Sequence, residues 1–180
     1  MSTPSKGRAP LTVKEMTVFA MLGAIMFCSK LLMDALPNIH LVGVLTMAYT
    51  LAFGKKALFP IYVNVMLVGL YGGFNLWWLP YLYIWTVLWG ATMLLPKRMT
   101  RKIAIIVYPI VCALHGLLYG TLYAPAQALM FGLNFEQTIA WIVAGLPWDG
   151  IHAAGNLALG FLILPISEIL DKLMRSRSRD

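Results

Sequence analysis

Three polar residues in the last long apolar segment have types and spacing that could do chemistry. Asp149, His152 and Asn156 are separated by three and then four residues, which places them on one face of a helix. A carboxylate, an imidazole and an amide inside an apolar segment are costly unless they face the protein interior, pair with one another or meet a polar ligand. Two interpretations stay open: an internal hydrogen-bond network that fixes helix packing, and the polar wall of a binding cavity. Other features of the chain favour the cavity.

A second polar row lies in the preceding apolar segment. His115 is followed at four-residue spacings by Tyr119 and Tyr123. If the two rows face each other, His115, Asp149 and His152 could serve a small intramembrane enzyme as acid-base groups or metal ligands. Their spacing matches no short metal-binding motif. We therefore expect no metal and no catalysis, and keep the enzyme as the alternative.

The elements that position these residues are predicted to be membrane-spanning helices. The chain of 180 residues is 60% hydrophobic and only 12% charged, about half the charged fraction of a soluble domain. We predict an all-α integral membrane protein with one membrane domain, residues 13–170, between basic tails at 1–12 and 171–180. Pro109 and Pro125 are expected to bend the fifth helix. The six predicted transmembrane helices cover residues 13–36, 39–53, 57–71, 81–95, 103–131 and 138–170.

The positions of the basic residues predict the topology. Thirteen of the fourteen Lys and Arg lie on one side: in the two tails, at Lys14 where the first helix begins, and in the second-to-third and fourth-to-fifth links. By the positive-inside rule, this side and both termini are cytoplasmic. Such clusters indicate topology and not nucleic-acid binding. The fourteenth, Lys30, lies four residues before Asp34, and this spacing predicts a mutually neutralising pair.

Aromatic and polar residues gather in the opposite, outer links and helix ends. Tryptophan and tyrosine favour membrane interfaces, so an aromatic belt accounts for about half of them. All six tryptophans are nevertheless predicted in the outer half or near mid-membrane. Aromatic faces beside a few polar groups are typical of a small-molecule site. No nucleotide-binding motif is present, so any ATP-driven transport would need another chain to hydrolyse ATP.

The first helix carries a small-residue motif. Ala20 and Ala24 are four residues apart, with Gly23 beside them. Small residues at this spacing allow another helix to approach closely, within the chain or from a partner. The motif is also compatible with a self-associating scaffold, which would leave the outer aromatic and polar residues unexplained.

Together these stretches resemble a known family. The six segments, the motif of the first helix and the stretches PNIHLVGVLTMAYTLAFGKKALFPIYV, GGFNLWWLPYLYIWTVLWG and GLPWDGIHAAGN are similar to the substrate-binding S components of energy-coupling factor (ECF) vitamin transporters. The resemblance covers nearly the whole chain. It implies a six-helix bundle in a bacterial plasma membrane that binds a vitamin or vitamin precursor at the outer face. It also implies inward delivery by toppling of the whole subunit.

The resemblance implies partners and site residues. Ala20, Gly23 and Ala24 would dock onto the transmembrane coupling (T) subunit, which rests on two ABC ATPase subunits that use ATP, so that no cofactor is expected in this chain. The ligand is expected to carry a ring, as in a pyrimidine or pyridine vitamer or cobalamin. From the resemblance and the two polar rows, the expected substrate-binding residues are Asn38, His40, Asn75, Trp77, Trp78, Tyr81, Trp85, Tyr123, Gln127, Trp141, Asp149, His152 and Asn156.

Overall fold

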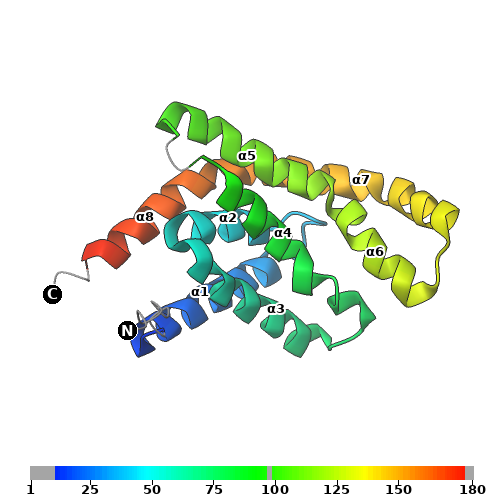
Figure 1. The fold of residues 1–180 in the computed structure, drawn as a ribbon, viewed down its shortest axis with the longest axis horizontal. Coiled ribbons are helices and arrows are strands. Elements are labelled where there is room, and N and C mark those ends of the chain that lie inside the picture. Colours follow the sequence, from blue (N-terminus) through cyan, green and yellow to red (C-terminus); the bar gives the residue numbers. More distant parts are fainter. Residues whose placement is uncertain (1–10, 97–98, 177–180) are drawn as a thin grey trace, which may run out of the picture.

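A computed structural model describes residues 11–96 and 99–176, the side chains of 175 and 176 excepted. These residues form helices and connecting turns, with no strand among them (Figure 1). The α-helices are α1 (Val13–Leu32), α2 (Val42–Phe53), α3 (Leu58–Gly72), α4 (Tyr81–Leu94), α5 (Arg101–Leu117), α6 (Tyr119–Phe131), α7 (Phe135–Leu159) and α8 (Ile163–Ser176). Short 3-10 turns are η1 (Gly54–Ala57), η2 (Leu76–Trp78) and η3 (Gly160–Leu162).

Each of the six predicted segments is helical, which confirms the all-α prediction. Among the described residues, four stretches are long and apolar enough to cross a membrane: Val13–Leu32, Val42–Gly72, Arg101–Phe131 and Phe135–Met174. Taken singly, α2, α3 and α4 have 12, 15 and 14 residues, fewer than the roughly 20 that a straight crossing needs. The chain therefore has the character of a membrane protein, and the count of six crossings stays a prediction.

Helix α2 forms the centre of the fold. Its residues 42–50 are all buried, and it contacts α1, α4, α5 and α8. A helix that is apolar all round is stable only when neighbours cover every face. Because α2 is fixed in this way, the link that precedes it, with Asn38 and His40, is held at one end of the helix bundle.

The fifth segment breaks at Leu118, and the prolines lie inside its two helices. Pro109 lies within α5 and Pro125 within α6, and α6 leaves the direction of α5 beyond the break (Figure 1). The backbone N–H of Gly120 donates to Asp149 of α7. This side-chain bond takes the place of the regular bond to the carbonyl four residues earlier, which explains why the helix is interrupted here.

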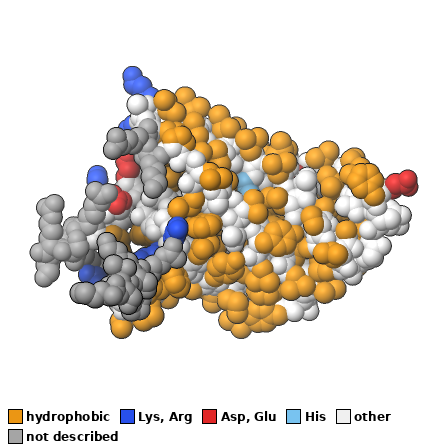
Figure 2. Space-filling model, viewed as in Figure 1, with side chains coloured by type: hydrophobic (Ala, Val, Ile, Leu, Met, Phe, Trp, Pro, Cys, Tyr) orange, Lys and Arg blue, Asp and Glu red, His pale blue; other side chains and the backbone are white. Residues whose placement is uncertain are grey.

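Two ion pairs tie helix ends together at the end of the bundle that carries the basic clusters. Lys56 pairs with Glu15, and Arg101 pairs with Glu168 at 3.2 Å. The Lys and Arg side chains visible in Figure 2 gather at this end, where α1 begins and α8 ends (Figure 1). Helix α8 continues to Ser176, so the predicted start of the C-terminal tail at 171 falls inside a helix. Residues 1–10 of the predicted N-terminal tail lie outside the described residues.

One tryptophan departs from the predicted outer placement. The Trp89 Nε1–H donates to the Gly54 carbonyl at 3.1 Å, and Gly54 directly precedes Lys55 and Lys56. Trp89 therefore lies toward the basic end. A shallow apolar groove of about 940 Å³ also runs there, lined by α3, Lys55 and Trp89. A groove of this kind is an ordinary lipid-facing surface in a chain with such long apolar helices.

The small-residue motif of α1 divides between two faces. Gly23 is buried, and a Cβ there would lie 2.5 Å from a Val63 side-chain atom and 2.8 Å from the Pro60 carbonyl. Gly23 therefore lies inside the close contact between α1 and α3. Ala20 is exposed and Ala24 is half-buried, so these two are the members of the motif that remain for a partner.

Candidate functional site

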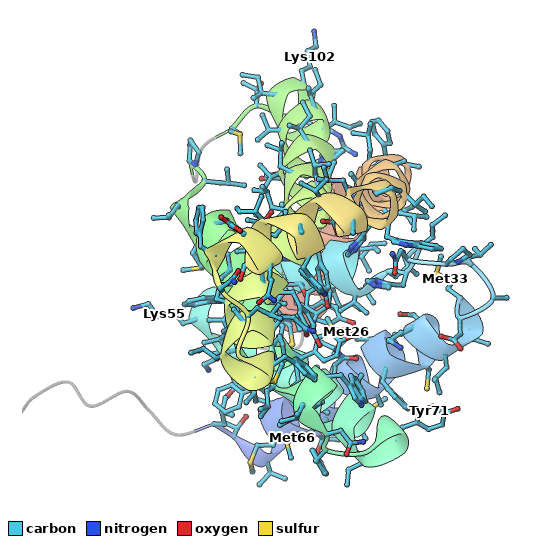
Figure 3. All side chains as sticks on the ribbon, turned by 90° about the vertical axis from the view of Figure 1, so that its right-hand side faces the viewer. Met26, Met33, Lys55, Met66, Tyr71 and Lys102 are labelled. Atoms are coloured by element: carbon cyan, nitrogen blue, oxygen red, sulfur yellow. The ribbon has the colours of Figure 1, made fainter. Side chains whose placement is uncertain are left out.

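A cluster of rings lies where the α1–α2 link meets α4, α5, α6 and α7, near the end of α1 at Met33 (Figure 3). His40 and His152 are 4.9 Å apart between ring centroids, and His152 and Tyr119 are 5.1 Å apart. Trp85 lies 6.1 Å from His40, 5.9 Å from Tyr119 and 5.7 Å from His115. The rings come from the α1–α2 link and from α4, α5, α6 and α7. The fold thus joins the two polar rows that the sequence placed on separate segments.

Each histidine of this cluster has a buried nitrogen that makes no hydrogen bond with the part of the chain that the structure describes. These atoms are His40 Nδ1, His115 Nδ1 and His152 Nε2; the other nitrogen of His115 lies 3.2 Å from the Ile84 carbonyl. Buried polar atoms in proteins are nearly always hydrogen-bonded, so three unpaired nitrogens in one cluster need an explanation. A polar ligand or ordered water would satisfy them.

A cavity of about 250 Å³ opens onto two of these histidines. Its wall is formed by the end of α1, the α1–α2 link and the tops of the ring-bearing helices, and Met33 marks its side in Figure 3. The polar members of the wall are Lys30, Asp34, Asn38, His40, Tyr81, Tyr119 and His152. Such a wall, with tyrosine rings and several hydrogen-bonding groups, suits a small polar ring compound.

The electrostatics of the cavity centre on Lys30 and His40. His40 lies in the link between the apolar stretches, and burial, followed by the Lys30 charge, lowers the pKa of His40 to about 4. Its imidazole is therefore neutral at pH 7. The structure does not form the predicted Lys30–Asp34 ion pair: within the described chain the two side chains share the cavity wall without a salt bridge.

Asp149 has a structural role in this arrangement. It is buried, and its two carboxylate oxygens accept the Gly120 N–H at 3.1 and 3.0 Å. A carboxylate at the first turn of a helix is favourable because unpaired N–H groups and the helix dipole meet it there. Asp149 is not part of the cavity wall. Asp149 lies three residues before His152, which lines the cavity. Its bond to Gly120 therefore holds the break between α5 and α6 beside the cavity.

Two further predicted residues also make internal contacts. The Asn156 Nδ2 donates to the Cys112 carbonyl at 3.1 Å, between α7 and α5. The Trp78 Nε1–H donates to the Val65 carbonyl at 2.8 Å, and the Trp78 side chain is buried. Neither residue lines the cavity. For Asn156, the internal network that the spacing left open is therefore the better interpretation.

Of the remaining predicted residues, Asn38 lines the cavity, whereas Asn75, Trp77, Tyr123, Gln127 and Trp141 are not part of its wall. Asn38, whose φ is +57°, lines the cavity and donates from Nδ2 to the Trp148 carbonyl at 3.3 Å, which fastens the link to α7. Tyr123 donates to the Trp77 carbonyl at 2.8 Å and stacks on Trp141 at 5.8 Å. Asn75 is exposed in the α3–α4 link. Gln127 lies half-buried on α6, and no hydrogen bond links its side chain to the described residues.

Tyr119 and Lys30 are among the cavity-wall residues that the sequence prediction left out of the binding site. Tyr119 contacts both Trp85 and His152, and its place in the row His115, Tyr119, Tyr123 was the available signal. Lys30 was assigned to a pair with Asp34, although a lysine inside an apolar segment is itself a signal of a functional site. No group of three or more His, Cys, Asp or Glu in the described chain could hold a metal ion.

Comparison of the chain with protein-family profiles, with curated proteins and with solved structures found no match.

Proposed function

We propose that this chain is the substrate-binding membrane subunit of an ECF-type vitamin importer. The observation that carries the proposal is the cavity of about 250 Å³ that borders His40, Tyr81, Tyr119 and His152 at the end away from the basic clusters. A binding subunit needs a site that opens on the outer side, and this cavity lies at the end that the positive-inside rule places outside.

The proposal includes a topology and an assembly. Six crossings with both termini in the cytoplasm of a bacterium place the ion pairs Lys56–Glu15 and Arg101–Glu168 at the inner surface. Ala20 and Ala24 contact the transmembrane coupling subunit, which two ABC ATPases drive. Toppling of the subunit then carries the occupied cavity inward. The resemblance of the sequence stretches supports this assembly, and the exposed position of Ala20 is compatible with it.

The cavity volume favours a compact ligand. Drug-sized ligands occupy sites of roughly 300–1,000 Å³, so about 250 Å³ suits a single ring with short substituents. A pyrimidine or pyridine vitamer fits this description better than cobalamin does. The intramembrane enzyme with His115, Asp149 and His152 has weaker support, because the Asp149 carboxylate is already bonded to Gly120.

Intrinsic fluorescence provides a test of the proposed function. Trp85 is 4% exposed and lies within the ring cluster, so a ring compound in the cavity should change its emission. We expect at least one compound from a panel of water-soluble vitamins to change the emission saturably at micromolar concentration or below. Trp85→Phe should remove most of the change, and Trp89→Phe at the basic end should retain it. A panel without any saturable response would contradict the proposal.

A further inference from the structure

Lys30 is the one Lys or Arg of the sequence placed away from the basic clusters, and no ion pair within residues 11–96 and 99–176 neutralises its charge. It lies on α1 inside an apolar stretch and is half-buried in the wall of the cavity. Its ammonium group has no hydrogen bond or ion pair with any described residue. An unpaired charge in such a position is costly, and in membrane segments it commonly marks the path of a substrate or ion.

Asp34 does not remove this charge. It lies one turn further along, at an exposed position, and belongs to the same cavity wall. The charge of Lys30, and not that of Asp34, is among those that act on His40 in the cavity wall. Lys30 is half-buried in this wall, whereas Asp34 is exposed. A ligand anion in the cavity would therefore lie against the half-buried Lys30 ammonium and beside the histidine and tyrosine rings of the wall.

The cavity wall that contains Lys30 also holds His40 and His152, whose ring nitrogens can form hydrogen bonds. His152 is 3% exposed and lines the cavity, and its Nε2 has no partner; the Nδ1 of His40 is likewise unpaired. A neutral imidazole can donate from one nitrogen and accept at the other. These groups can bond a carboxylate oxygen or a ring nitrogen, while Tyr81 and Tyr119 offer faces for a ring.

The volume limits the size of the ligand. About 250 Å³ corresponds to roughly eight water molecules at ~30 Å³ each. This is room for one six-membered ring with a short substituent and a few waters. A ligand with a long flexible chain or several fused rings does not fit the cavity as it stands.

We infer that the cavity binds a compact aromatic carboxylate, with the carboxylate at Lys30 and the ring between the tyrosines and His152. This inference rests on the proposed function and adds the charge of the ligand to it. The specificity-determining residue is then Lys30, because a neutral amide of the same shape would leave its ammonium unpaired.

Matched acids and amides test this inference on the purified full-length protein in detergent. Benzoate with benzamide, and pyridine-3-carboxylate with pyridine-3-carboxamide, differ within each pair in charge and hardly in shape. We expect the carboxylate of at least one pair to bind about tenfold or more tightly than its amide, as charge-assisted hydrogen bonds suggest. Lys30→Met should remove this preference by weakening the acid and leaving the amide unchanged.

Two variants show whether Lys30 acts through its charge. Lys30→Arg should restore most of the preference for the acid, because it keeps the cation. Lys102→Met, a matched charge removal at an exposed lysine outside the cavity, should leave the preference for the acid unchanged. A preference that survives in Lys30→Met, or an amide that binds as tightly as its acid, would overturn the inference.

The failure of this inference and that of the proposed function are distinguishable. If neither pair binds but the purified protein releases a neutral vitamin, the charge assignment is wrong and the binding subunit stands. If neither pair binds and no vitamin binds or is released, both are wrong.

Discussion

The Asp149 carboxylate accepts the Gly120 backbone N–H through both oxygens, at 3.1 and 3.0 Å, from one helix to the start of another. This contact joins α7 to the break between α5 and α6. The break turns the chain just where Tyr119 reaches His152, at 5.1 Å between ring centroids. Asp149 therefore shapes the cavity without lining it, and this relationship leads to the first prediction.

Removal of the Asp149 carboxylate should destabilise the fold. Asp149→Ala leaves a buried N–H unpaired, and we expect a loss of about 1–3 kcal/mol in the free energy of unfolding. Asp149→Asn keeps an acceptor oxygen and should lose less. Thermal unfolding in detergent measures the difference. Equal midpoints for Asp149→Ala and the wild type would contradict this role.

Glycine substitutions on either side of the same contact provide a matched pair. A Cβ at Gly120 would lie 2.5 Å from an Asp149 oxygen, whereas a Cβ at Gly150 meets nothing within 4 Å. Gly120→Ala should therefore lower the unfolding midpoint, and Gly150→Ala should leave it unchanged or raise it, since alanine favours a helix. A Gly120→Ala variant as stable as Gly150→Ala would show that the contact does not constrain the helices.

Substitutions on the two faces of the α1 motif should have different effects. One on the buried face should lower the stability of the subunit, and one on the exposed face should weaken its assembly with a partner. Gly23→Ala forces a Cβ against Val63 and the Pro60 carbonyl, and overpacking of this kind costs about 1–3 kcal/mol. Ala20→Leu lies on the exposed face and should leave the stability of the isolated subunit within about 0.5 kcal/mol. In the proposed importer, Ala20→Leu should weaken binding to the coupling subunit. The measurements are thermal unfolding and co-purification with that subunit, and the opposite pattern would reverse the assignment of the faces.

The adjacent tryptophans of the α3–α4 link should behave differently. Trp78→Phe loses the bond to the Val65 carbonyl inside the fold, which we expect to cost about 1 kcal/mol plus the lost packing. Trp77 is 37% exposed, and Trp77→Phe should change stability little. Chemical or thermal unfolding compares the two. Equal losses would contradict the internal role assigned to Trp78.

The stability of the protein should depend on pH through His40. Its pKa is about 4 in the folded chain against 6.5 in an unfolded one, so the unfolded state binds the proton first as the pH falls. The contribution of His40 to stability is complete above pH 6.5 and is lost between 6.5 and 4. His40→Gln should make the fall in stability over this range shallower and leave the profile above pH 7 parallel to that of the wild type. Superimposable profiles down to pH 4 would contradict a neutral, buried His40.

The sequence predicted the helices better than it predicted which way their faces turn. Apolar length located all six segments, and the i, i+3 and i+4 spacings placed His115 with Tyr119 and Asp149 with His152. The break at Leu118 was missed because its cause is a side chain on another helix, and no local signal marks it. Asn156 was expected in the ligand site from its spacing and Trp78 from the resemblance. In the structure both side chains bond backbone carbonyls of neighbouring helices and neither lines the cavity, which spacing alone does not show.

The association of His40 with the site depended on the resemblance to a family and not on periodicity. The structure places it 4.9 Å from His152, although 112 residues separate them in the chain. Lys30 shows the opposite case. Its four-residue spacing to Asp34 suggested a local pair, whereas within the described residues the two side chains line one cavity without a salt bridge.

Mass spectrometry of small molecules released from the detergent-purified protein is the most direct test of the binding-subunit proposal. The comparison is the wild type with His152→Ala in the cavity wall, and with Ile151→Ala on the exposed face of the same helix. We expect one compact ring compound at near-stoichiometric amount from the wild type and from Ile151→Ala, and little from His152→Ala. Protein that releases no such compound, and that takes none up from a vitamin mixture, would contradict the account.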